Sequence, residues 1–173
     1  NVYNEGTLDW LARRGATRIC LPPELPLASV ARLAQAGRAA GVAVEVWGHG
    51  RAPLAISGRC YHARLHDRAK DSCQFVCGED PDGLPVDTLD GQAFLSINGV
   101  QTMSSTCMSL LAEVPALTAM GIASLRLSPQ VCDMVAVAAT FRAVADARLD
   151  PAEAEAKLAL AYPEAAFANG FFH

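Results

Sequence analysis

Three cysteines in one polar segment are the residues best suited to chemistry in this chain. They are Cys60, Cys73 and Cys77, and they follow the spacing C-x12-C-x3-C. If the intervening loop folds back, the three thiolates converge on one point, and soft thiolate ligands bind zinc or iron–sulfur clusters. Structural zinc sites often contain closely spaced cysteine pairs, which Cys73 and Cys77 resemble. The spacing therefore predicts a metal centre and leaves both alternatives open.

The charges around these cysteines argue against inert core cysteines, which have apolar neighbours. The chain has a net charge of −4, yet five basic residues lie between positions 51 and 70: Arg51, Arg59, Arg64, Arg68 and Lys70. Nearby cations favour the thiolate form and can hold an anionic ligand. We predict that Arg51, Arg59 and Arg64 bind an anionic substrate beside the metal. The alternative is a solvated charged loop, and the scarcity of aromatic residues disfavours RNA as a partner.

The remaining cysteines have no spacing typical of metal ligands. Cys20 falls on a predicted strand and Cys132 on a predicted helix, and we expect both, together with Cys107, to be packing residues. Glu45 alternates with valines near the end of a predicted strand, where barrel enzymes gather active-site carboxylates. An ion pair with Arg51 or another cation is the alternative for Glu45.

Composition indicates one compact domain. The chain has 173 residues, of which 51% are hydrophobic and 18% charged. Its six cysteines do not suit a small secreted disulfide scaffold, so we expect thiols in a reducing compartment, the cytoplasm. We find no transmembrane run and no secretion signal in the sequence. Because the first residue is not Met, we expect that further sequence precedes Asn1.

Predicted helices and strands alternate at both ends of the chain. Strands are expected at 18–21, 42–47 and 122–127, and helices at 8–14, 29–40, 109–120, 130–148 and from Asp150 onward. Between them, residues 48–105 are rich in turns. In this segment Asn98-Gly99 separates two apolar runs, 93–97 and 100–104, which predicts a hairpin.

Such alternation predicts an α/β fold with a parallel sheet. Three strands are too few for a closed (β/α)₈ barrel, which typically needs about 250 residues. We therefore expect residues 1–173 to be a single domain fragment, the C-terminal part of a TIM-like barrel. Its barrel elements would lie in 1–47 and 106–173, its cysteine-bearing loop and hairpin insertion in 48–105, and the N-terminal part of the barrel upstream. A small open α/β sheet is the alternative.

Three stretches carry a resemblance to a known family: Ser-Gly-Arg-Cys-Tyr-His-Ala-Arg (57–64), Asp-Ser-Cys-Gln-Phe-Val-Cys (71–77) and Phe-Leu-Ser-Ile-Asn-Gly-Val-Gln-Thr-Met-Ser (94–104). They resemble the collagenase-like peptidase superfamily. The resemblance implies a TIM-like barrel with a [4Fe-4S] cluster held by four cysteines. Three of these fall on Cys60, Cys73 and Cys77, and the fourth is expected in the missing N-terminal part.

The resemblance also implies an activity. It suggests the iron–sulfur subunit of an oxygen-independent hydroxylase in anaerobic ubiquinone biosynthesis. Such a subunit acts on a quinone precursor with a prephenate-like oxygen donor, in a heterodimer with a UbiU-like homologous subunit. The alternatives are an RNA-base hydroxylase or peptidase-like member of the superfamily, and a zinc-stabilised non-enzymatic partner subunit. Peptidase activity is not supported, because no nucleophile–base pair or metalloprotease motif occurs, and the catalytic residues remain unassigned.

Overall fold

A computed structural model describes residues 1–172 as a mixed α/β fold around one sheet. The strands in these residues are β1 (Arg18–Cys20), β2 (Ala43–Ile56), β3 (Leu84–Asp87), β4 (Ala93–Asn98), β5 (Gln101–Ser109), β6 (Ser124–Leu127) and β7 (Phe167–Ala168). The helices are α1 (Glu5–Ala12), α2 (Leu27–Ala40), α3 (Tyr61–Leu65), α4 (Val114–Ala119), α5 (Met134–Ala145) and α6 (Pro151–Ala161), with short 3₁₀ helices η1 (Lys70–Ser72) and η2 (Val76–Glu79).

Strand β2 is the centre of the sheet. Its first half pairs in parallel with β1 on one side and with β6 on the other. Its second half pairs antiparallel with β5, which continues the sheet through β4 to β3, and β7 adds to β5 in parallel. The α/β prediction is confirmed, but the sheet of the described residues is open and does not close into a barrel.

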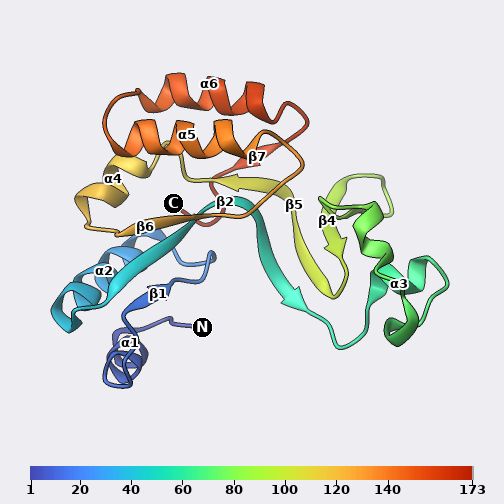
Figure 1. The fold of residues 1–173 in the computed structure, drawn as a ribbon, viewed down its shortest axis with the longest axis horizontal. Coiled ribbons are helices and arrows are strands. Elements are labelled where there is room, and N and C mark those ends of the chain that lie inside the picture. The colour runs from blue at the N-terminus through green and yellow to red at the C-terminus, as the bar shows by residue number, and fades with distance from the viewer. Residues whose placement is uncertain (173) are drawn as a thin grey trace.

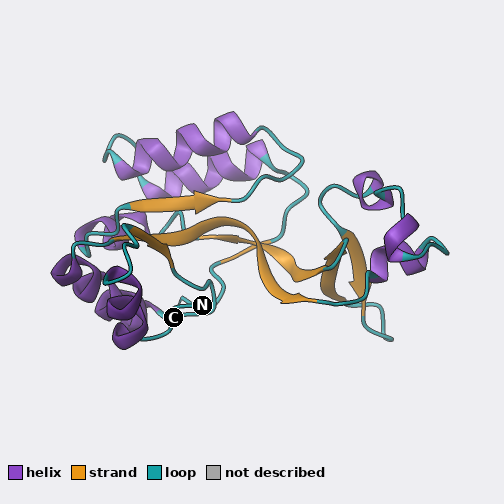
Figure 2. Cartoon of the chain, turned by 60° about the horizontal axis from the view of Figure 1, so that its bottom comes forward, coloured by secondary structure: helices purple, strands orange, loops and turns teal. Residues whose placement is uncertain are grey.

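The long strands β2 and β5 connect two parts of the molecule (Figure 1). At one end, α1 and α2 lie on one side of the parallel strands, and α4, α5 and α6 lie on the other (Figure 2). At the other end, β3, β4 and α3 form a smaller lobe with η1 and η2. We call residues 57–100 the cysteine lobe. Both β2 and β5 run unbroken past positions 48 and 105, where the predicted insertion begins and ends.

We call the parallel strands with helices α1, α2, α4, α5 and α6 the helical part. Apolar residues form two clusters, and both lie in this part. One packs α1 and α2 against the sheet through Leu8, Leu33 and Val44. The other packs α4, α5 and α6 together through Val114, Phe141 and Leu158 and their neighbours. The large buried apolar side chains therefore hold the parallel strands and helices rather than the cysteine lobe.

Several element boundaries follow from local chemistry. The side chain of Asp150 accepts a hydrogen bond from the Ala152 N–H at 2.9 Å and begins α6, as predicted. The predicted helix over 109–120 is wrong in its first part, because β5 extends to Ser109 and α4 begins only at Val114, with a proline in its first turn. The predicted helix over 130–148 begins at Met134, so Cys132 precedes it.

The predicted hairpin is confirmed with a shifted turn. Asn98 pairs with Gln101, so the two-residue loop is Gly99-Val100 rather than Asn98-Gly99. Gly99 has φ 59°, the left-handed conformation that the first loop position of this turn class requires. The shift makes Asn98 the last residue of β4, and its side chain is free to form hydrogen bonds with other residues of the cysteine lobe.

Candidate functional site

Cys60 lies where β2 gives way to α3. It occupies the N-cap position of α3, and its sulfur accepts a hydrogen bond from the Ala63 N–H at 3.4 Å. The residue is 8% exposed. Helix α3 packs against η2, which carries Cys77, and against β4. The fold therefore brings the elements that carry two of the three predicted ligands into contact, although 16 residues of sequence separate Cys60 from Cys77.

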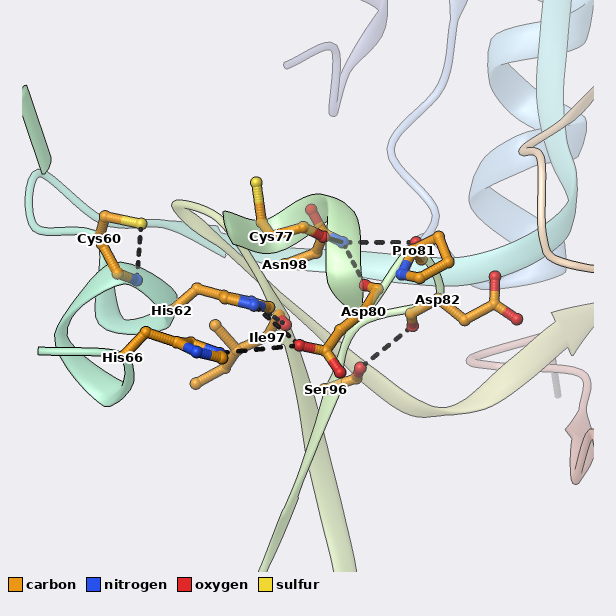
Figure 3. A network of polar contacts seen from close by, with 11 residues as sticks. Cys60, His62, His66, Cys77, Asp80, Pro81, Asp82, Ser96, Ile97 and Asn98 are labelled. Carbon is orange, nitrogen blue, oxygen red and sulfur yellow. Dashed lines mark hydrogen bonds and ion pairs between the residues drawn. The ribbon is translucent and has the colours of Figure 1, made fainter. Parts of the chain in front are cut away.

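Cys77 is half-buried near the β4–β5 turn. A Cβ atom added to Gly99 would lie 3.8 Å from the Cys77 sulfur. The Asn98 side-chain amide donates hydrogen bonds to the Asp80 carbonyl at 2.8 Å and to the Pro81 carbonyl at 3.3 Å. Figure 3 draws the Cys60 and Cys77 sulfurs on the same side of this polar network. The hairpin turn therefore fixes the chain that follows Cys77.

Cys73 ends η1 and is half-buried. Its carbonyl oxygen accepts a hydrogen bond from Arg68 Nη1 at 2.9 Å. The next two residues, Gln74 and Phe75, have φ angles of 53° and 55°, an uncommon conformation for side chains of this size. Such strain costs on the order of 1–3 kcal/mol per residue and is concentrated at ligand-binding sites. The turn between Cys73 and Cys77 is therefore strained.

The cysteines do not match the geometry of a single ion. Within residues 1–172, their three sulfurs do not form a group whose ligand atoms all lie within 4.8 Å of one another. Tetrahedral zinc would require such a group, because its bonds to sulfur are about 2.3 Å long. As the sulfurs lie, Cys60, Cys73 and Cys77 therefore do not form a tetrahedral zinc site, and a metal centre at these cysteines stays a prediction.

The three predicted anion-binding arginines lie in different settings. Arg51, in β2, donates from Nη1 to the Ser104 carbonyl at 3.0 Å and to the Ser105 carbonyl, so its guanidinium helps join β2 to β5. Arg59 and Arg64 are exposed on the cysteine lobe, on either side of Cys60 in the sequence. Arg59 and Arg64 thus belong to the same lobe as the cysteines, whereas Arg51 lies on the strand that leads to the lobe.

Glu45 pairs with Arg126, and not with Arg51. Its Oε1 accepts a hydrogen bond from Arg126 Nε at 2.7 Å, and its Oε2 accepts one from the Ser124 hydroxyl at 2.9 Å. Burial opposes ionisation of the carboxyl, but the two hydrogen bonds together with the positive charge of Arg126 and a contact with Cys20 lower the pKa of Glu45 below its usual value. The pair joins neighbouring strands β2 and β6, which indicates a structural role.

The three other cysteines differ in burial. Cys107 is 3% exposed, and burial raises the pKa of its thiol to about 11, as expected of a packing residue. Cys20 and Cys132 are only half-buried, so the prediction of core residues holds for them in part. Burial still raises the pKa of both thiols, which keeps them protonated near neutral pH.

Sequence reasoning missed one polar cluster. His62, on α3, and His66, the residue that ends α3, face Asp80, which follows η2 (Figure 3). These three are the one group of potential metal ligands in residues 1–172 whose ligand atoms lie within 4.8 Å of one another. The histidine pair has the i, i+4 spacing that places two side chains on one helix face, a signal visible in the sequence. Asp80 could be found only from the fold.

The fold and the site define an α/β protein with an open sheet and a cysteine-bearing lobe. The sequence profile of Peptidase family U32 matches residues 1–173, and the chain belongs to this family. No solved structure matches the chain. None of the helices in residues 1–172 is both long and apolar enough to cross a bilayer.

Proposed function

We propose that this chain is the iron–sulfur subunit of an oxygen-independent hydroxylase in anaerobic ubiquinone biosynthesis. It would correspond to the UbiV type of family U32 protein and act in a heterodimer with a UbiU-like subunit. The observation that carries the proposal is the set of three cysteines, Cys60, Cys73 and Cys77, within one lobe in which α3 packs on η2 and β4. Family membership supports it.

In this proposal the three cysteines hold a [4Fe-4S] cluster, and a fourth ligand comes from outside residues 1–173. Once bound, the cluster would supply redox chemistry. The protein contributes the surroundings. The Ala63 N–H donates to the Cys60 sulfur, and hydrogen bonds of this kind stabilise negative charge on sulfur and tune the cluster potential. Burial of Cys60 limits the access of water to one side of the site.

Arg59 and Arg64 are the residues proposed to bind the oxygen donor. Both are exposed on the cysteine lobe and carry a permanent charge. A prephenate-like donor has two carboxylates, and the guanidinium fork matches a carboxylate with two hydrogen bonds. Arg51 would attract the donor through its positive charge rather than through hydrogen bonds from Nη1, because its Nη1 already donates to two carbonyl groups of β5.

The architecture around the site is proposed to be the C-terminal part of a TIM-like barrel. The support is the parallel pairing of β1, β2 and β6, with α2 connecting β1 to β2. The remaining barrel strands would precede residue 1, and residues 48–105 would form the cluster-binding insertion. The heterodimer partner would be built on the same plan, as its homology implies.

The test is the colour and iron content of the anaerobically purified protein. A [4Fe-4S] protein absorbs near about 400 nm, whereas zinc is colourless. We expect Cys60→Ala, Cys73→Ala and Cys77→Ala each to lose most of this absorbance and iron. The matched control is Cys132→Ala, which removes a half-buried thiol outside the lobe and should retain both. A colourless wild-type protein containing zinc, or equal iron loss in the control, would contradict the proposal.

The exposed arginines make an RNA-base hydroxylase the second candidate. A growth experiment separates the two. Under the first proposal, deletion of the gene removes ubiquinone only when oxygen is absent. Normal quinone levels without oxygen, together with the loss of a hydroxylated RNA base, would favour the second candidate.

A further inference from the structure

Two imidazole rings, of His62 in α3 and of His66 at its end, face the same carboxylate oxygen. His62 Nε2 lies 3.0 Å from Asp80 Oδ2, and His66 Nε2 lies 4.0 Å from the same atom. The rings are stacked, with centroids 5.4 Å apart and planes inclined by 7°. His62 lies in the first turn of α3 and His66 is the residue that ends the helix, so the two side chains, four positions apart, lie on the same side. Three ligand atoms from two separate elements are thus aimed at one point (Figure 3).

From this geometry we propose that His62, His66 and Asp80 bind a divalent transition-metal ion, separately from the cysteines. The donor set is two imidazole nitrogens and one carboxylate oxygen, and imidazole suits zinc, iron, copper and nickel ions. Three protein ligands leave further coordination positions open to water or a small ligand. The proposal goes beyond the proposed function and does not depend on a cluster at the cysteines.

The buried ring of His62 provides the independent observation. Its side chain is 0% exposed, and its Nδ1 lies 3.3 Å from the Ile97 carbonyl oxygen, which can only accept a hydrogen bond. A proton on Nδ1 would be donated to this carbonyl, and Nε2 would then present a lone pair. A metal-binding histidine typically donates its other ring N–H to such a carbonyl, which fixes the tautomer and orients the ring.

Nε2 of His62 is left without a hydrogen-bond partner although it is fully buried. A lone pair on Nε2 needs a hydrogen-bond donor, but the neighbouring Asp80 carboxylate is itself an acceptor. Two acceptors 3.0 Å apart repel each other unless a cation or a second proton lies between them. A metal ion satisfies His62, His66 and Asp80 at once, whereas one added proton can bridge only one imidazole to the carboxylate.

The backbone of Asp80 is held in place by hydrogen bonds, one of them from the hairpin. The Asp80 carbonyl accepts hydrogen bonds from Asn98 Nδ2 and from the Gly83 N–H, both at 2.8 Å. Ile97 and Asn98 are neighbours on β4, so one strand end orients both the histidine and the aspartate. Support of this kind around the ligands is what a metal site requires, and its loss typically weakens binding about 10–100-fold.

The test is zinc binding by protein in which Cys60, Cys73 and Cys77 are all replaced by alanine, so that thiolates do not compete. Isothermal titration calorimetry with Zn²⁺ should give one ion per chain. Adding His66→Gln or Asp80→Asn should weaken zinc binding at least about tenfold. Both residues are partly exposed, so these variants should fold. The control Asp71→Asn, an exposed carboxylate of the same lobe, should bind as before.

The same question can be answered with the cysteines intact if the triple variant does not fold. After reconstitution with zinc and dialysis, elemental analysis should find one zinc fewer per chain in His66→Gln than in wild type. No zinc bound to the folded triple variant, or equal zinc in wild type and His66→Gln, would overturn the proposal and leave a protonated histidine–aspartate pair. Iron retention at the cysteines is measured separately, so the two sites succeed or fail independently.

Discussion

His49 is a neutral histidine inside the helical part of the molecule. Its side chain is fully buried, its ring nitrogens lie 3.9 Å from the Cys107 sulfur, and its ring packs edge-on against Phe141 with centroids 5.9 Å apart. Burial lowers the pKa of His49 to about 4, because the charged form would lose its hydration. His49 is next to the basic residues of 51–70 in the sequence, but it adds no positive charge to them at neutral pH.

This burial predicts a pH-dependent stability. Between pH 6.5 and about 4, unfolded His49 binds a proton that the folded protein excludes, so stability is lost as the pH falls through this window. At pH 5 the loss from this residue is about 2 kcal/mol relative to pH 7.5. Urea unfolding at both pH values measures it. His49→Phe should unfold with a weaker dependence on pH, and an unchanged dependence would show that other groups cause it.

At the scale of elements, the contact between α2 and β2 depends on a glycine in the helix. A Cβ atom at Gly37 would lie 2.5 Å from Val44 Cγ2 and 2.9 Å from the Val42 carbonyl oxygen. Glycine inside a helix costs about 1 kcal/mol relative to alanine. The structure explains this glycine, because α2 approaches the sheet closely at this position.

Gly37→Ala should consequently destabilise the protein despite the better helix propensity of alanine. Overpacking costs about 1–3 kcal/mol, which exceeds the gain in propensity or cancels it. We expect a net loss of up to about 2 kcal/mol in the free energy of unfolding, measured by chemical denaturation. The control is Gln35→Ala at an exposed position of the same helix, expected to lie within about 0.5 kcal/mol of wild type. A stabilising Gly37→Ala would mean that α2 moves away from β2 at little cost.

For the whole molecule, stability is distributed unevenly. Both apolar clusters lie in the helical part, and the cysteine lobe buries few large side chains apart from Val76 and His62. Local opening is expected where apolar contacts are few. The cysteine lobe should therefore open more readily than the parallel strands when neither of its proposed metal sites is filled.

Hydrogen exchange followed by mass spectrometry measures this difference. In metal-free protein, amides of residues 57–100 should exchange faster than those of β1, β2 up to Trp47, and β6. Reconstitution with iron or zinc should slow exchange in the lobe and leave the strands unchanged, because a ligand stabilises the folded state that binds it. Equal protection throughout the metal-free protein would show that the lobe is already as stable as the helical part.

Local patterns in the sequence determined much of this protein. The alternation of apolar runs indicated the positions of α1, α2, β1, β6 and α6, and the Asn98-Gly99 signal located the hairpin. The cap at Asp150 was correct because a cap depends only on residues within one turn. The cysteine motif and the family resemblance identified Peptidase family U32.

Tertiary structure alone decided what depends on distant residues. The sequence did not reveal that β2 continues to Ile56 and carries the cysteine lobe on an antiparallel pair, because pairing with β5 joins residues some fifty positions apart. It did not reveal the partner of Glu45, which is 81 residues away. The group formed by His62, His66 and Asp80 also depends on the fold, since the packing of α3 on η2 brings the carboxylate to the imidazoles.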